Sequence, residues 1–193
     1  MNVLLQGDMM IPIIGGVILL SIVLVGIVFY RKHKSKRPEQ RLRSVAFDIL
    51  SNFLIPNGDD GEIIVEYALL THRGIVIVDI KDIEGNVFGS DAMQDWTVIS
   101  DNRRFTFSNP QFALYDRLAA VRRLVNGIPV IGYVAFTNRG QFSKGQPSDV
   151  IAFDLLVSDL KSGSPANGGD AVRSWLPQWD SLRDSVIAAQ GCD

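Results

Sequence analysis

The feature that most constrains this chain is an uncharged, apolar segment near its N-terminus. From Met9 to Tyr30 no residue is charged, and almost every residue is apolar. About 20 such residues in a helix, at ~1.5 Å per residue, cover the ~30 Å hydrocarbon core of a bilayer. Backbone groups in lipid must hydrogen-bond to one another, so a helix is expected despite the three glycines. We therefore predict one transmembrane helix over residues 9–30.

The charges that flank this segment predict its orientation. Residues 31–37, RKHKSKR, contain five Lys and Arg and no acidic residue, whereas Asp8 is the only charged side chain before the segment. The positive-inside rule then places residues 1–8 outside and the rest of the chain in the cytoplasm, as in a single-pass protein of the inner or plasma membrane. A cleaved signal peptide fits less well, because it needs a basic region before a shorter apolar run. Residues 9–37 are accordingly expected to contact membrane lipid.

The remainder, residues 38–193, has the length of one compact domain. It contains every acidic residue except Asp8, so it is net negative and has no broadly basic surface for nucleic acid. The single cysteine, Cys192, rules out an internal disulfide and a site with several cysteine ligands. We predict a folded domain over 38–161, a flexible linker over 162–170 and a C-terminal amphipathic helix over 171–193.

Hydrophobic spacing in this region predicts an α/β fold. Apolar residues three and four apart favour helices, and β-branched, nearly continuous apolar runs favour buried strands. Asn109-Pro110 is typical of a helix start. The expected order, α-β-β-β-α-β, implies a sheet covered by helices on both faces. The expected elements are helices over 38–55 and 110–125, strands over 62–70, 74–81, 96–99, 105–107 and 130–137, and a short strand leading into a helical turn over 150–160.

Two carboxylates and a lysine lie on the two best-defined strands. Asp79 and Lys81, two residues apart, project from the same face of one strand. Glu66, on the neighbouring antiparallel strand, reaches the same position if the register places it opposite them. Two carboxylates and a main-chain carbonyl suit Mg²⁺, which would activate a water that Lys81 could orient. The competing interpretation is an ordinary strand end at which Asp79 and Lys81 form a solvated ion pair.

The segment around these residues resembles the nuclease-related domain (NERD) family, a branch of the PD-(D/E)xK nuclease-like superfamily. The resemblance covers roughly residues 39–160. The family pattern has Asp, His and Glu where this chain has Glu66, Tyr67 and Asp79, and it has Gln at the position of Ala113. The motifs that carry the resemblance are Gly61-Glu62, Val65-Glu66-Tyr67, Gly74, Asp79-Ile80-Lys81, Gly85, Gly89, Trp96 and Asn109-Pro110.

The resemblance implies a restriction-endonuclease-like mixed sheet and metal-dependent hydrolysis of phosphodiester bonds in nucleic acid. The implied cofactor is Mg²⁺ or Mn²⁺, and the implied substrate is DNA or RNA. The implied catalytic residues are Glu66, Asp79, Lys81 and Gln111, and the implied metal ligands are Glu39, Glu66 and Asp79.

Several alternatives to these roles remain open. Gln111 and Tyr115 match a Gln-x-x-x-Tyr spacing of related nucleases, but Gln111 could equally be solvated and Tyr115 part of the core. Glu39 could simply interact with the positive end of a helix. Trp96 is expected in the core rather than as a platform for base stacking. Because both candidate carboxylates, Glu66 and Asp79, differ in length from the family pattern, the alternative function is a non-catalytic module that binds nucleic acid or protein at the membrane.

Overall fold

The computed structural model describes residues 37–58, 61–101, 103–162 and 168–190. The chain divides into two compact units, Met1–Arg41 and Leu42–Asp193. Of the first unit only the start of helix α2 (Arg37–Arg43) is described. The predicted transmembrane helix, residues 9–30, lies outside the described residues, and within those residues no helix is long and apolar enough to span a bilayer.

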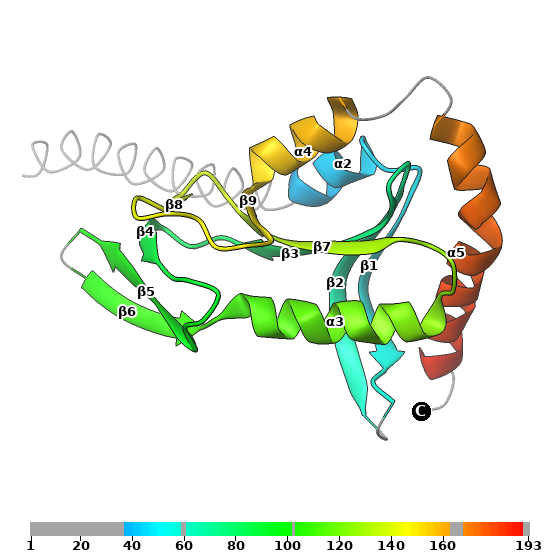
Figure 1. Ribbon diagram of the computed structural model, residues 1–193, viewed down its shortest axis with the longest axis horizontal. Coiled ribbons are helices and arrows are strands. Elements are labelled where there is room, and N and C mark those ends of the chain that lie inside the picture. The colour runs from blue at the N-terminus through cyan, green and yellow to red at the C-terminus, as the bar shows by residue number, and fades with distance from the viewer. Residues whose placement is uncertain (1–36, 59–60, 102, 163–167, 191–193) are drawn as a thin grey trace, which may run out of the picture. The chain divides into compact units, whose positions relative to one another are not determined.

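The second unit is built on a five-stranded mixed sheet in the order β1-β2-β3-β7-β9 (Figure 1). Its first three strands pair antiparallel, whereas β7 and β9 run parallel to β3. A parallel pair needs a crossover, and helix α3 (Pro110–Leu124) lies in the connection from β3 to β7. The strands are β1 (Asp48–Pro56), β2 (Glu62–Thr71), β3 (Gly74–Lys81), β7 (Val130–Phe136) and β9 (Val150–Ala152).

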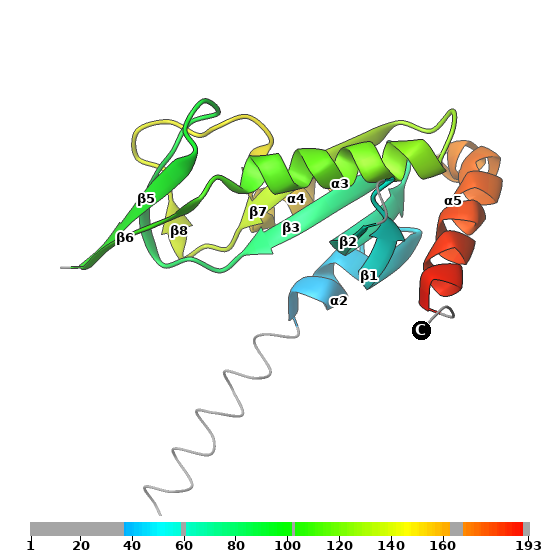
Figure 2. The same ribbon diagram turned by 90° about the horizontal axis from the view of Figure 1, so that it is seen from below.

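Helices cover both faces of this sheet, as expected from the buried character of β3. Helix α3 runs along one face, beside β3 and β7 (Figure 2). Its Leu114 and Leu118 belong to the same buried cluster as Ile77 of β3. On the other face α4 (Phe153–Ser162) packs Leu156 against residues that include Val78. The first six residues of β3 are therefore buried, and its last two, at the candidate site, are half-buried.

Helix α5 (Gly168–Gln190) packs beside β1. Its Trp179 and Leu182 are buried in the same core as α3, and the Trp179 Nε1–H donates to Asp48 Oδ2 at 2.9 Å. The helix begins inside the segment predicted to be a linker, of which residues 163–167 lie outside the described residues.

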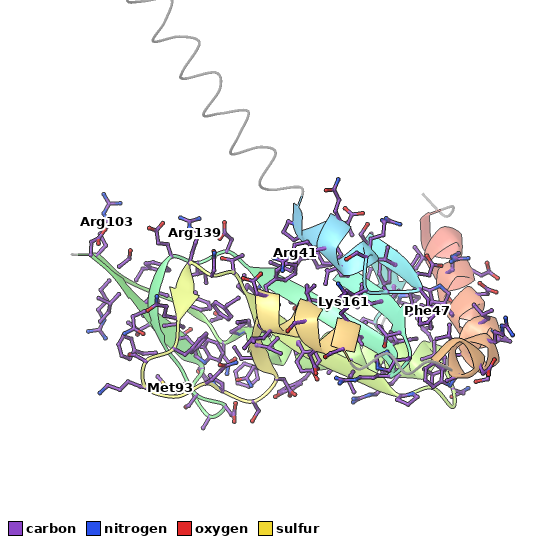
Figure 3. All side chains as sticks on the ribbon, turned by 90° about the horizontal axis from the view of Figure 1, so that it is seen from above. Arg41, Phe47, Met93, Arg103, Arg139 and Lys161 are labelled. Atoms are coloured by element: carbon purple, nitrogen blue, oxygen red, sulfur yellow. The ribbon has the colours of Figure 1, made fainter. Side chains whose placement is uncertain are left out.

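A second, four-stranded sheet has the order β6-β5-β4-β8. Trp96 of β5 is fully buried and contacts the rings of Phe107, Phe136 and Phe142. Figure 3 shows Arg103 and Arg139 at this end of the second unit and Phe47 toward α5. The strands are β4 (Gly85–Phe88), β5 (Asp95–Ser100), β6 (Arg103–Ser108) and β8 (Gly140–Gln141).

The prediction of a helix over 38–55 is wrong for most of that range. The helix ends at Arg43, and residues 48–56 form β1 instead. Asn52 has a φ of 51°, a left-handed conformation that interrupts the alternation of the strand. Ile49 consequently packs in the core on the α4 face, whereas Phe53 packs in the core on the α3 face. Ile49 and Phe53 lie four residues apart, which is also the spacing of apolar residues on one face of a helix.

The other strand and helix predictions are mostly confirmed. Strands are present at 62–71, 74–81 and 130–136, a helix spans 110–124, and a short strand leads into a helix from residue 150. The strands near 96–99 and 105–107 exist but belong to the second sheet, and β4 and β8 were not expected. The order α-β-β-β-α-β therefore holds for α2, β1, β2, β3, α3 and β7, with β1 as its first strand. The strands β4, β5 and β6, which lie between β3 and α3 in the sequence, belong to the second sheet. The mixed α/β architecture is consistent with a nuclease-like fold.

Candidate active site

The candidate site lies where strands β2 and β3 separate. Their backbone pairing extends from Thr71 opposite Gly74 to Tyr67 opposite Val78 and ends there. Side chains alternate along a strand, and Val78 faces α4. Asp79, the next residue, therefore projects to the opposite face of the sheet, beneath α3.

Glu66 occupies the position at which the backbone of β2 leaves β3. Its Oε2 accepts a hydrogen bond from the backbone N–H of Ile80 at 2.8 Å. The Glu66 side chain thus takes the place of a backbone carbonyl of β2 as the partner of β3 beyond the last backbone pair. Burial raises the pKa of Glu66 and the Asp79 carboxylate raises it further, while the Ile80 N–H, Lys81 and Arg117 lower it. The strand register thus places Glu66 close enough to Asp79 and Lys81 to interact electrostatically with both. Their catalytic and metal-binding roles remain predictions.

Asp79 is a carboxylate in the protein interior, with 1% of its surface exposed. Its Oδ2 pairs with Nη1 of Arg117 at 2.7 Å. Its Oδ1 is buried and has no hydrogen-bond partner within the part of the chain that is described. Burial raises the pKa of Asp79, and the nearby Arg117 and Lys81 oppose that shift. A buried acceptor without a partner is costly, so Oδ1 is the atom at which a bound ion or water would stabilise the site.

Lys81 supplies a positive charge at the end of β3. It lies two residues beyond Asp79 on the same face, and its side chain is half-buried. Its charge lowers the pKa of both Glu66 and Asp79. The interpretation of Asp79 and Lys81 as a solvated ion pair does not fit, because Asp79 is buried and forms its ion pair with Arg117.

Arg117 of α3 was not identified from the sequence. Besides its pairing with Asp79, it donates from Nε to the backbone carbonyl of Ile64 at 2.6 Å. It therefore joins β3 to the end of β2 that has separated from it. One signal was present, since Arg117 lies among Leu114, Leu118 and other apolar residues at helical spacing, where a charged side chain is unusual.

The carboxylates at this site fit in part the ligands of an Mg²⁺ or Mn²⁺ ion that keeps several of its waters. Such ions commonly bind one or two carboxylates and keep several waters. Glu66 and the unpartnered Oδ1 of Asp79 provide two carboxylates, but Arg117 occupies the other oxygen of Asp79. No group of three or more His, Cys, Asp or Glu side chains suited to a metal ion occurs among the described residues.

Glu39, the third ligand that the resemblance implies, lies in the first turn of α2. It belongs to the first compact unit, whereas Glu66 and Asp79 belong to the second. Its participation in a metal site remains a prediction.

Gln111 anchors a separate polar network at the start of α3. It is 1% exposed, and its Nε2 donates to Asp91 Oδ1 at 2.8 Å, to the Ser148 carbonyl at 2.6 Å and to the Tyr115 hydroxyl at 3.4 Å. The Tyr115 hydroxyl in turn bonds Asp149 at 3.2 Å. Tyr115 is exposed, so the alternative of a solvated Gln and a core Tyr is wrong on both counts. These contacts tie two loops to α3, and a catalytic role for Gln111 remains a prediction.

The glycines and the tryptophan of the resemblance have structural roles. A Cβ on Gly85, whose φ is 127°, would lie 2.6 Å from the carbonyl oxygen of Ile99. A Cβ on Gly89 would lie 2.4 Å from the ring of Trp96. Trp96 is fully buried and donates from Nε1 to the Ser90 carbonyl at 3.2 Å, which confirms that it belongs to the core.

In comparisons with known proteins, a family profile covers the segment that carries these motifs. The profile of the nuclease-related domain (NERD) matches residues 33–137, which is more than half of the chain. An uncharacterized protein of Bacillus anthracis is 24% identical over 102 residues, covering 52% of this chain and 48% of its own length. The chain thus spans about half the length of this curated relative. No solved structure matches it significantly.

Proposed function

Because the chain belongs to the nuclease-related domain family, we propose that it is a metal-dependent nuclease that hydrolyses phosphodiester bonds of nucleic acid. The observation that carries the proposal is the cluster at the separated ends of β2 and β3. There Glu66, Asp79 and Lys81 interact electrostatically, and Oδ1 of Asp79 lacks a partner. A buried and a half-buried carboxylate with raised pKa values beside a lysine are more typical of a functional site than of a strand end.

In this proposal each residue of the cluster has a distinct task. Glu66 and Asp79 hold a divalent ion, and the hydrogen bond from Ile80 fixes the Glu66 carboxylate against the sheet. When bound, the ion would lower the pKa of a coordinated water and offset charge on the phosphate. Lys81, on the same face as Asp79, would orient the attacking water and stabilise the negative charge that develops as the bond breaks.

The test is hydrolysis of single- and double-stranded DNA and RNA by the full chain with Mg²⁺ or Mn²⁺. We expect Lys81→Ala to lower the rate by about 10²-fold or more, as loss of an electrostatic catalytic group commonly does. The matched control is Lys161→Ala, an exposed lysine on α4 (Figure 3), which should leave the rate unchanged. Equal rates for the native chain and Lys81→Ala, or no hydrolysis by either, would argue against the proposal.

A second candidate function is a non-catalytic module that binds nucleic acid or protein on the same fold. The observation in its favour is Arg117, which neutralises Asp79 within the chain itself. This alternative expects nucleic acid to bind without hydrolysis, and the binding to be unaffected by Glu66→Gln. Hydrolysis by the native chain that Glu66→Gln abolishes would contradict it.

We also propose that residues 9–30 anchor the protein in the inner or plasma membrane, with the nuclease-related domain in the cytoplasm. The support is the uncharged apolar segment followed by the basic residues 31–37. Such an anchor would restrict the activity to nucleic acid near the membrane. The full chain should resist alkaline extraction from membranes, and a variant without residues 9–30 should be released. Release of both forms would refute the anchor.

A further inference from the structure

Arg117 holds the position at which a cation would neutralise the candidate site. It reaches the cluster from α3 through two contacts, Nη1 to Asp79 Oδ2 at 2.7 Å and Nε to the Ile64 carbonyl at 2.6 Å. The guanidinium is therefore fixed by the main chain of β2 as well as by the carboxylate. No other ion pair to Asp79 is found among the described residues.

The relative exposure of the two partners indicates how a metal ion would have to approach. The side chain of Arg117 is 21% exposed, whereas that of Asp79 is 2% exposed. Arg117 is thus the more exposed partner of the pair. An ion that reaches Asp79 also comes close to the Arg117 guanidinium, which contacts the same carboxylate. Two cations within a few ångströms repel each other strongly in a partly buried site.

The contact to Ile64 allows Arg117 to leave Asp79 without leaving the site. Since Nε bonds a backbone carbonyl, the guanidinium keeps one partner if a metal ion displaces Nη1 from Oδ2. Oδ1 of Asp79, which is buried and without a partner, is available from the start. Asp79 therefore has one oxygen without a partner, Oδ1, and one, Oδ2, whose partner Arg117 can be displaced.

We propose that Arg117 is a resident counter-cation that competes with a divalent metal ion for Asp79 and so sets how tightly the site binds metal. The inference rests on the proposed function, because it requires Glu66 and Asp79 to be the metal ligands. In the metal-free protein Arg117 compensates the buried charge of Asp79. Metal binding then requires Arg117 to release Oδ2, which lowers the affinity of the site.

The experiment measures Mn²⁺ and Mg²⁺ binding by calorimetry to the full chain, purified in detergent because residues 9–30 are apolar. Arg117→Gln removes the charge and should bind Mn²⁺ about tenfold more tightly than the native chain. Arg117→Lys keeps the charge but not the forked pair of contacts, so its affinity should stay near the native value. The matched control is Arg123→Gln on the same helix, which loses a bond to the Asn57 carbonyl and should bind as the native chain does.

A second measurement follows the native chain and uses the charge-conserving variant Arg117→Lys only to assign one signal. In the native chain labelled with ¹⁵N-arginine, Mg²⁺ should shift the side-chain Nε signal that is missing from Arg117→Lys. A signal that does not move at saturating Mg²⁺ would overturn the inference.

The outcomes separate this inference from the proposed function. The inference is supported if Arg117→Gln binds Mn²⁺ more tightly than the native chain and Arg117→Lys does not. Equal, measurable affinity in the native chain and Arg117→Gln overturns the competition but leaves the metal site intact, and equal gains in Arg117→Gln and Arg117→Lys show that geometry rather than charge is responsible. No binding by any folded form overturns both the inference and the metal-dependent function.

Discussion

Asp79 illustrates at the level of one residue how a candidate active site can reduce stability. Its carboxylate is almost fully buried, and burial raises its pKa despite the opposing charges of Arg117 and Lys81. The folded protein therefore favours the protonated form more than the unfolded chain does. A carboxylate with a raised pKa contributes stability below its unfolded pKa, and that contribution is lost as the pH rises through the folded pKa.

We accordingly expect Asp79→Asn to raise the melting temperature of the metal-free chain at pH 7. The amide carries no charge, so the cost of burying one at neutral pH disappears. The gain should shrink as the pH falls through the raised pKa of Asp79, because the native carboxyl then becomes protonated itself. Thermal unfolding of both forms between pH 7 and pH 4 measures this difference.

Asp82→Asn serves as the control for that experiment. Asp82 is exposed and pairs with Arg139 on the surface, where a substitution usually changes stability by less than ~0.5 kcal/mol. A loss of stability in Asp79→Asn at pH 7 would mean that the ion pair with Arg117 outweighs the cost of burial, contrary to the direction of the pKa shift.

At the level of elements, local pattern predicted the central strands and missed their irregular neighbour. β3 and β7 are uninterrupted apolar runs, and for such segments periodicity and β-branching agree. β1 was mistaken for a helix because the left-handed Asn52 moves the apolar side chains of its two halves to opposite faces of the sheet. Such a break depends on how β1 pairs with β2, which spacing within β1 alone does not reveal.

The second sheet depends on a close contact between Gly89 and the Trp96 ring. Because a Cβ on Gly89 would lie 2.4 Å from the buried ring, Gly89→Ala should force either Trp96 or the connection between β4 and β5 to move. We expect a loss of about 1–3 kcal/mol in the free energy of unfolding, the usual cost of overpacking a core. Denaturant unfolding followed by tryptophan fluorescence measures it.

Gly169→Ala is the comparison for this substitution. Gly169 lies in the first turn of α5, and no atom lies within 4 Å of the position of its added Cβ. The free energy of unfolding should therefore stay constant or rise slightly, because alanine favours a helix. A cost in Gly89→Ala no greater than in Gly169→Ala would show that the Trp96 contact can relax.

For the whole molecule, the sequence predicted that Glu66, Asp79 and Lys81 lie near one another but not how their charges are balanced. The antiparallel register of β2 and β3 was enough to bring Glu66 near Asp79 and Lys81. Arg117 could not be placed in the same way, because its contacts depend on how α3 packs across the sheet, 38 residues further along the chain. The likeness to nuclease-related domains therefore pointed to Glu66, Asp79 and Lys81 as the candidate site, and the structure added Arg117 as the cation that pairs with Asp79.

The central claim is that Glu66 and Asp79 together hold a divalent ion, and Mn²⁺ binding to the full chain tests it most directly. The native chain should bind one ion, and Glu66→Gln and Asp79→Asn should each weaken binding by about tenfold or more, as the loss of one of two charged ligands implies. The double variant should show no binding. If both single variants are folded and bind Mn²⁺ as tightly as the native chain, the ion is held elsewhere and the assignment of the site is contradicted.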